Sequence, residues 1–244
     1  MRIEVCEIAR VLRSGEIMAV TLNKNRGRRM VTRFSLPAAI FVIALSASGQ
    51  VDRARAAGVS QQDLHGKMNY CNVCHGASGR GFVGYYPIPR LAGQQVEYIE
   101  NQLKGFVEHK RVNTESPTAT NVMFNVGHVL SAEMIRALAT SFHDLNPKPV
   151  GGAPKTNVAA GKKIFEEGIP GTNVPPCASC HGADGKGSDA IPRLAGQLYP
   201  YVVKQLANWG KERTEQNSEI MAPIAHELSQ PQIEAVAAYL SGME

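Results

Sequence analysis

The pattern Cys-x-x-Cys-His occurs twice in this chain of 244 residues, at positions 71–75 and 177–181. Four of the five cysteines belong to these two copies, and the fifth, Cys6, lies near the N-terminus. Each copy brings two thiols and an imidazole together on one short stretch of backbone. The fold must therefore present the same compact set of reactive side chains at two places.

In an exported protein this pattern is the attachment site of c-type haem. Two thiols separated by two residues can add to the two vinyl groups on one edge of a porphyrin, and the next histidine then supplies an axial nitrogen to the iron. We therefore expect two covalently attached haem c groups. The attachment residues and axial histidines are Cys71, Cys74 and His75 in the first copy, and Cys177, Cys180 and His181 in the second.

Three other uses of paired cysteines fit less well. A redox dithiol is disfavoured because no βαβ pattern surrounds either motif. A zinc site is disfavoured because Cys74 and Cys177 are 103 positions apart, whereas paired cysteines of zinc sites are separated by about 15–20 residues. Disulfides within each motif would leave the two histidines unexplained.

The chain also repeats itself beyond these motifs. The segment Ile-Pro-Arg-Leu-Ala-Gly-Gln follows the first motif at residues 88–94 and the second at 191–197. A methionine followed by a histidine and then Leu-Ser recurs at Met123 and Met221. This pattern indicates duplication of a whole domain, with small deletions in the loops, and not a solenoid of short repeats.

Apolar residues at helical spacing and capping residues predict an all-α fold. We expect two tandem domains, each with about three to five helices around one haem. The domains are assigned to residues 57–145 and 156–244, joined by a Pro/Gly-rich linker at 146–155. Helices are expected after the capping residues Ser60, Ser131, Asn157 and Ser229, and also over residues 96–109 and 201–209.

A glycine and an aromatic residue four positions apart recur in the first helix of each domain. They are Gly66 with Tyr70, and Gly161 with Phe165. This spacing predicts that the first and last helices of each domain cross closely. In the first domain, Phe142 is the aromatic residue of the last helix expected to make that contact.

Residues 1–56 have the features of a leader. An uncharged, mostly apolar run at residues 36–49 follows several arginines and precedes Ala54-Arg55-Ala56, which is the pattern of a secretory signal peptide. A start at Met30 would give this leader the usual length, so we interpret 30–56 as the signal peptide and 1–29 as misassigned upstream sequence. The apolar run is shorter than the roughly 20 residues of a membrane span, and an uncleaved N-terminal anchor is the alternative. Export predicts a periplasmic protein.

The charge distribution bears on the partners. Of 26 basic residues 10 lie in the first 56 positions, against 4 of 21 acidic residues. The overall charge of +5 therefore comes from the leader. Once the leader is removed, the charge no longer argues for a nucleic-acid partner. Association of the basic leader with an anionic membrane surface stays open.

A sixth ligand completes the coordination of each low-spin iron. Met123 and Met221 recur in what we expect to be a loop before the last helix, and His/Met pairs are known in c-type cytochromes. The recurring His128 and His226 are the rival ligands, which we interpret as surface histidines. The carbonyls that follow the motifs at Pro89 and Pro192 are expected to accept a hydrogen bond from the second nitrogen of each axial histidine.

Together, the paired Cys-x-x-Cys-His-Gly-Ala, Pro-Arg-Leu-Ala-Gly-Gln and Met…Leu-Ser motifs resemble those of the dihaem class I cytochromes c of the cytochrome c4 family. The resemblance implies two all-α cytochrome domains related by a pseudo-twofold axis, with facing haems and axial pairs His75–Met123 and His181–Met221. Met123 is followed by Phe-Asn-Val-Gly, which is less similar to the family than the sequence after Met221.

The expected function is electron carriage in the periplasm and not enzymatic turnover, because two filled axial positions keep substrate from the iron. Partners would be redox proteins such as a cytochrome complex, a terminal oxidase or a dehydrogenase. The alternative is a cytochrome subunit of a dehydrogenase such as a flavocytochrome. A dihaem peroxidase is less favoured, because it needs one axial position open and both domains carry the methionine.

Overall fold

The structure is a computed structural model that describes residues 7–11, 17–22, 29–34, 58–112, 117–212 and 218–244. The chain divides into two compact units, Met1–Asp52 and Arg53–Glu244. In the part that the structure describes, no helix is long and apolar enough to cross a membrane.

The first unit contains a small antiparallel sheet that the sequence did not lead us to expect. Its strands are β1 (Glu7–Val11), β2 (Ile17–Leu22) and β3 (Arg29–Phe34), in the order β1-β2-β3. Met30, the predicted start, lies in β3 and pairs with Thr21. The apolar run of the predicted signal peptide lies outside the described residues, so the leader stays a prediction.

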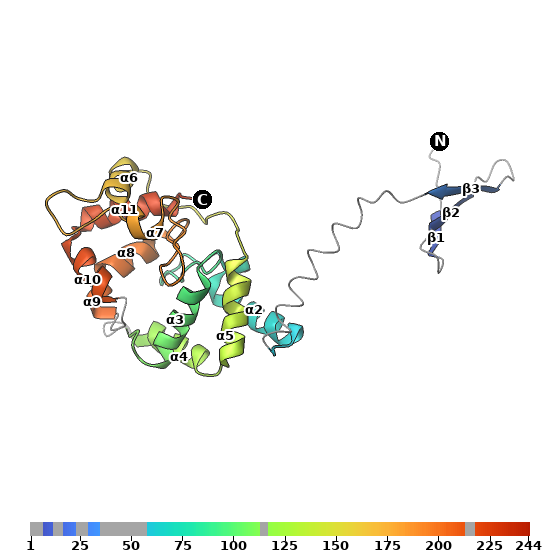
Figure 1. Cartoon of the computed structure of the whole chain (residues 1–244), viewed down its shortest axis with the longest axis horizontal. Helices are drawn as coiled ribbons and strands as arrows, with labels where there is room; N and C mark the ends of the chain where they lie inside the picture. The colour runs from blue at the N-terminus through green and yellow to red at the C-terminus, as the bar shows by residue number, and fades with distance from the viewer. Residues whose placement is uncertain (1–6, 12–16, 23–28, 35–57, 113–116, 213–217) are drawn as a thin grey trace. The chain divides into compact units, whose positions relative to one another are not determined.

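The second unit is helical, as predicted, and contains both motifs (Figure 1). Its first half holds α2 (Gln61–His75), the short 3-10 helix η2 (Ala77–Gly79), α3 (Val96–Val107), α4 (Pro117–Gly127) and α5 (Ala132–His143). Its second half holds α6 (Val158–Glu167), α7 (Ala178–His181), α8 (Tyr199–Ala207), α9 (Trp209–Glu212), α10 (Ser218–Glu227) and α11 (Gln230–Ser241). The two halves are called domain 1 and domain 2 below.

Serine caps set the starts of several helices, which confirms those predictions. The Ser60 hydroxyl accepts a hydrogen bond from the Asp63 N–H at 3.1 Å, and the Ser131 hydroxyl accepts one from the Met134 N–H at 3.2 Å. These bonds satisfy backbone donors that the first turn of a helix leaves unpaired. Asn157 precedes α6 as expected, but it adopts a left-handed conformation with φ 61° and makes no side-chain cap bond.

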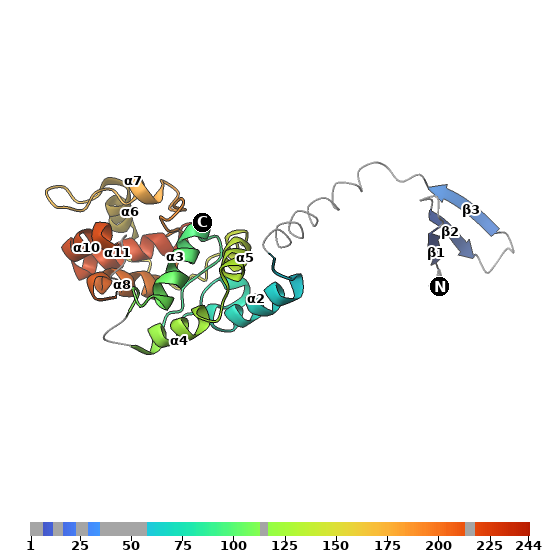
Figure 2. The ribbon, with the colours of Figure 1, turned by 60° about the horizontal axis from the view of Figure 1, so that its bottom comes forward.

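The core of domain 2 forms where α11 packs against α6 and α8 (Figure 2). Phe165 on α6 is completely buried, and its ring lies 5.5 Å from that of Tyr239 on α11. Gly161 meets the backbone of α11 directly at Ala235. The predicted close crossing of the first and last helices is therefore confirmed in domain 2.

In domain 1 the first and last helices also pack together, but through Cys71 of α2 against the core cluster that contains Phe142 of α5, and not at Gly66. A side chain at Gly66 would meet nothing within 4 Å among the described residues, and Tyr70 is 60% exposed. The main packing is of α5 against α3, and Phe142 is buried against Gly79 just after the first motif. The two first helices also differ in how they join their motifs, because α2 runs directly into its motif whereas a loop separates α6 from α7.

The linker between the domains has no helix or strand, but it is tied to domain 1. Arg90 donates a hydrogen bond from Nη1 to the Pro147 carbonyl at 2.8 Å, and Arg80 donates one to the Lys148 carbonyl at 3.3 Å. The segment is therefore held at its first residues by two arginines.

Candidate functional site

The first motif occupies the last turn of α2, which ends at His75. Gly76 follows with φ 76°, and a side chain there would collide with the Gly81 carbonyl. The Gly81 N–H in turn donates to the His75 carbonyl at 2.7 Å. A glycine is therefore required directly after the motif, because the backbone has a positive φ there and the following loop folds back against the end of the helix.

The second motif repeats this local fold on the short helix α7. Cys177 is the residue before α7, and His181 is the last residue in it. Gly182 follows with φ 80°, and the Gly187 N–H donates to the His181 carbonyl at 2.8 Å. Both motifs thus end in the same glycine-dependent turn, although the helices that carry them differ in length.

The two motif histidines are buried in the same way. His75 and His181 are 9% and 7% exposed. Nδ1 of His75 lies 2.9 Å from the Pro89 carbonyl oxygen, and Nδ1 of His181 lies 2.9 Å from that of Pro192. Because a carbonyl only accepts, Nδ1 carries the proton and Nε2 keeps its lone pair. The predicted proline carbonyl contacts are confirmed in both domains.

The electrostatic surroundings keep these histidines neutral. Burial lowers the pKa of His75 and that of His181, and it outweighs the opposite effect of the bonds to Pro89 and Pro192. Arg111 lowers the pKa of His75 further. A neutral imidazole with a fixed Nδ1–H and an available Nε2 is the form that binds a metal ion.

The four motif cysteines form no disulfide in the part of the chain that the structure describes, and they have two different environments. Cys71 and Cys177 pack partly against the hydrophobic cores, and burial raises the pKa of both thiols, to about 11 for Cys177. Cys74 and Cys180 are exposed. Each motif therefore offers two separate thiols and one buried neutral imidazole, which is the donor set that covalent haem attachment requires.

A cavity of about 920 Å³ lies beside α2 in domain 1. Its lining includes Gly66, Tyr70 and Cys71 from α2 and Leu130 and Met134 from the α4–α5 region. It lies on the side of α2 where Gly66 has no neighbour within 4 Å among the described residues. The first thiol of the motif thus borders this cavity.

The predicted sixth ligands lie on helices and not in loops, which corrects the expectation. Met123 lies on α4, which packs against α3, and Met221 lies on α10, which packs against α8 and α9. Both side chains are half-buried. Pro117 can begin α4 because proline is tolerated at the first position of a helix. Their role as ligands stays a prediction.

The rival histidines are both exposed. The His128 ring stacks on Phe124 with 5.2 Å between ring centroids. The His109 ring also stacks on Phe124, with 4.6 Å between ring centroids. His226 lies near the end of α10. Their exposure agrees with the interpretation as surface histidines.

Sequence reasoning did not assign a role to the arginine and glutamine of the repeated Pro-Arg-Leu-Ala-Gly-Gln segment. These side chains are among the few buried polar ones: Arg90, Gln94, Arg193 and Gln197 are 3%, 5%, 7% and 7% exposed. Each glutamine side chain bonds to the backbone of the arginine in the other domain. The guanidinium groups bond instead to carbonyls of their own half and, for Arg90, of the linker. The recurrence of the arginine and glutamine in both copies was the available signal, but a repeat does not reveal which residues meet across an interface.

Comparisons with known proteins agree with the geometry. The cytochrome c family model matches residues 158–244. Cytochrome c-552 of Acidithiobacillus ferridurans is 36% identical over 212 residues, covering 86% of this chain and 87% of that protein. Cytochrome c4 of Pseudomonas aeruginosa is 31% identical over 208 residues, covering 84% and 98%. The solved structure of Acidithiobacillus ferrooxidans cytochrome c4 is 37% identical with a TM-score of 0.62, covering 72% of this chain and 99% of that chain.

Proposed function

Because the chain belongs to the cytochrome c4 family of dihaem c-type cytochromes, we propose that it carries electrons one at a time between redox proteins of the periplasm. The observation that carries this proposal is the repeated histidine geometry. In both domains a buried, neutral imidazole is fixed through Nδ1 at 2.9 Å from a proline carbonyl, with Nε2 left to bind iron.

The four motif cysteines would attach the two haems. Each thiol would add across one vinyl group, with the sulfur on one carbon and the hydrogen on the other, so that no atom leaves. The attachment residues are Cys71 and Cys74 in domain 1 and Cys177 and Cys180 in domain 2. Haem iron, when bound, supplies reversible one-electron chemistry.

His75 and His181 would each supply a nitrogen ligand to the haem iron, and Met123 and Met221 would each supply a thioether ligand. This assignment is supported by the recurrence of the methionines at matching places before the last helix and by their partial burial. Methionine ligation raises the reduction potential, which suits a carrier late in a respiratory chain. With both axial positions taken, no substrate reaches the iron, and the chain acts as a carrier without turnover chemistry of its own.

Two tethered domains make transfer between the haems intramolecular. A short linker holds the second domain at high effective concentration near the first, and here the bonds from Arg90 to the linker and across the interface restrict its motion. Donors and acceptors would be a cytochrome complex, a terminal oxidase or a dehydrogenase. Export by the predicted signal peptide would place the carrier in the periplasm with these partners.

The test is intact mass and visible spectroscopy on protein purified from the periplasm. We expect two haem masses added to a chain that begins near residue 57, and low-spin spectra at both irons. Colourless protein, or one high-spin iron with peroxidase activity, would overturn the proposal. Purification in a fixed ratio with a large catalytic subunit would instead assign the chain as a dehydrogenase subunit.

A further inference from the structure

One peptide group links the motif histidine of domain 1 to a side chain of domain 2. The Pro89 carbonyl accepts the hydrogen bond from His75 Nδ1 at 2.9 Å. The N–H of the same peptide group belongs to Arg90, and it donates to Oε1 of Gln197 at 2.8 Å. The histidine, the peptide and the glutamine therefore form one continuous chain of hydrogen bonds.

An equivalent chain of hydrogen bonds links the motif histidine of domain 2 to a side chain of domain 1. The Pro192 carbonyl accepts from His181 Nδ1 at 2.9 Å, and the N–H of that peptide, on Arg193, donates to Oε1 of Gln94 at 2.7 Å. Each domain thus provides the glutamine that ends the hydrogen-bond chain of the other domain.

Both glutamines are locked in place. Nε2 of Gln197 donates to the Arg90 carbonyl at 3.0 Å, and its Oε1 also accepts from the Leu198 N–H at 3.0 Å. Nε2 of Gln94 donates to the Arg193 carbonyl at 3.0 Å in the equivalent bond. Because both side chains are buried, water competes little for these bonds, and hydrogen bonds in a low-dielectric interior are electrostatically stronger.

We propose that each glutamine sets the reduction potential of the haem in the opposite domain: Gln197 acts on the haem held by His75, and Gln94 on the haem held by His181. The inference rests on the proposed function, because it assumes that both histidines bind haem iron. Both glutamines are positioning residues, since they act through a peptide group and a histidine.

The mechanism follows from the polarity of a peptide group. Hydrogen bonds in series polarise one another, so accepting the Arg90 N–H makes the Pro89 carbonyl a stronger acceptor. A stronger acceptor draws the Nδ1 proton of His75 and raises the basicity of the imidazole. A more electron-rich imidazole stabilises the oxidised iron. The glutamine therefore lowers the potential of the haem across the interface.

The test uses the exported dihaem protein and compares Gln197→Leu with Gln94→Leu. We expect Gln197→Leu to favour reduction of the haem held by His75 by about threefold, or ~28 mV at 59 mV per tenfold for one electron. The other haem should change much less, and Gln94→Leu should give the reverse pattern. A redox titration monitored by NMR resolves the two haems. The Nδ1–H resonance of each motif histidine reports the hydrogen bond of that histidine.

Gln197→Glu is a second variant, for which we expect the reduction potential of the haem held by His75 to shift in the opposite direction. A carboxylate accepts the Arg90 N–H more strongly than an amide does, so the haem held by His75 should become harder to reduce. The Nδ1–H resonance of His75 should then move in the direction opposite to that in Gln197→Leu. This variant keeps a polar side chain in the interface and tests the mechanism if the leucine variant fails to mature.

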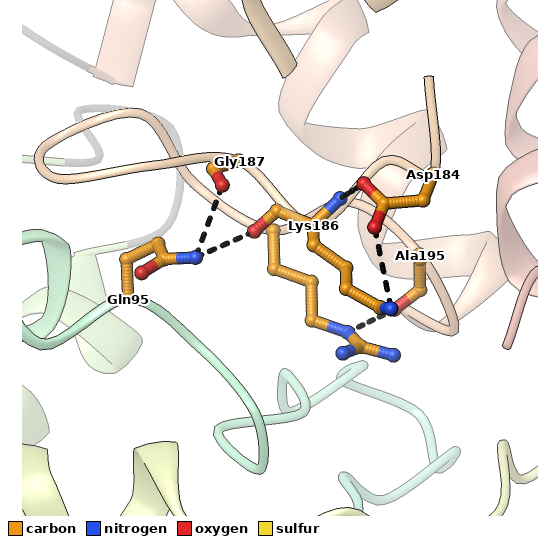
Figure 3. A network of polar contacts seen from close by, with 6 residues as sticks. Gln95, Asp184, Lys186, Gly187 and Ala195 are labelled. Atoms are coloured by element: carbon orange, nitrogen blue, oxygen red, sulfur yellow. Dashed lines mark hydrogen bonds and ion pairs between the residues drawn. The ribbon is translucent and has the colours of Figure 1, made fainter. Parts of the chain in front are cut away.

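Gln95→Leu is the matched control (Figure 3). Gln95 also reaches from domain 1 to domain 2, where Nε2 donates to the Lys186 carbonyl at 2.8 Å and the Gly187 carbonyl at 3.2 Å. It contacts neither Pro-Arg peptide, so its removal weakens the interface without interrupting a histidine chain. We expect the reduction equilibrium of each haem to stay within about 1.5-fold of wild type, or ~10 mV at 59 mV per tenfold for one electron.

The inference requires that each glutamine variant change the potential of the haem in the opposite domain. Equal shifts at both haems, a shift only in the glutamine's own domain, or the same shifts in Gln95→Leu would overturn the inference and leave the glutamines as interface contacts. Haem content and low-spin spectra of the wild-type protein are measured first. Two normal haems with potentials unmoved by the Gln variants refute this inference alone, whereas missing haem refutes the proposed function.

Discussion

Gly161 on α6 lies directly against the backbone carbonyl of Ala235 on α11, with no room for a side chain between the two helices. The contact lets Phe165 reach the interior of domain 2, where it is completely buried. The corresponding Gly66 in domain 1 faces open space. One repeated glycine therefore has two different structural roles.

Gly161→Ala should destabilise domain 2. The added methyl overlaps the Ala235 carbonyl, so α6 must move away from α11, at a cost of about 1–3 kcal/mol. Gly66→Ala is the matched control and should stabilise α2 by about 0.5–1 kcal/mol, because alanine favours helix over glycine. Denaturant unfolding of both holoproteins measures the difference. Equal stability of the two variants would contradict the close crossing.

Arg90→Lys should release the linker. Burial lowers the pKa of Arg90 to about 10, so the side chain is still charged at neutral pH. Its guanidinium donates to the carbonyls of Ala92 at 2.9 Å and Pro147 at 2.8 Å. A lysine cannot reproduce this planar fork, and the loss of hydrogen bonds to a charged group costs about 1.5–3 kcal/mol. We expect faster proteolytic cleavage within residues 146–155.

Arg193→Lys serves as the control for that experiment. Arg193 makes the equivalent bond to the Ala195 carbonyl at 2.9 Å, but the linker residues are held by the domain 1 arginines. Its substitution should therefore destabilise the interface while leaving linker cleavage near the wild-type rate. If both variants were cleaved alike, general opening of the interface, and not the Arg90 contacts, would explain the result.

Local chemistry was predictable from the sequence, whereas packing between distant segments was not. Ser60 and Ser131 cap their helices as expected, and Pro89 and Pro192 meet the motif histidines, because these contacts depend on nearby residues. The exposure around Gly66 depends on where distant segments pack, and the repeated glycine alone does not reveal it. The glutamine contacts depend on how two domains dock, and no periodic pattern encodes that arrangement.

The helical position of the methionines shows a second limit. The methionines were expected in a loop before the last helix, but Met123 lies on α4, which begins at Pro117, and Met221 lies on α10, which contains Pro223. Proline without a backbone donor is compatible with a first turn, and its cost within a helix is overridden by tertiary packing in α10. The candidate ligands were found by repetition, while their local structure was set by their neighbours.

Removing one attachment cysteine should leave haem bound through the other. In Cys180→Ala the remaining thioether at Cys177 keeps the haem mass on the chain, but one vinyl group stays conjugated with the porphyrin. The absorption bands of that reduced haem should therefore move to longer wavelength. Mass spectrometry under denaturing conditions and the pyridine haemochrome spectrum measure the two effects. Cys74→Ala should act in the same way on the haem of domain 1, and an unshifted spectrum would argue against thioether attachment at that position.

Met221→Ala should convert one haem to a high-spin or water-ligated form while both haems stay covalently attached. The thioether is the proposed axial ligand opposite His181, and losing it removes a ligand that raises the reduction potential. The potential of that haem should fall, and the far-red absorbance band that accompanies Fe–S(Met) ligation should weaken, because one of the two haems has lost its methionine ligand. Met123→Ala should do the same for the haem held by His75. Met134→Ala is the control, because Met134 packs against the domain 1 core and is expected to contribute only packing. Spectra and potentials unchanged in Met221→Ala would show that another side chain, with exposed His226 the first to examine, closes the iron of domain 2.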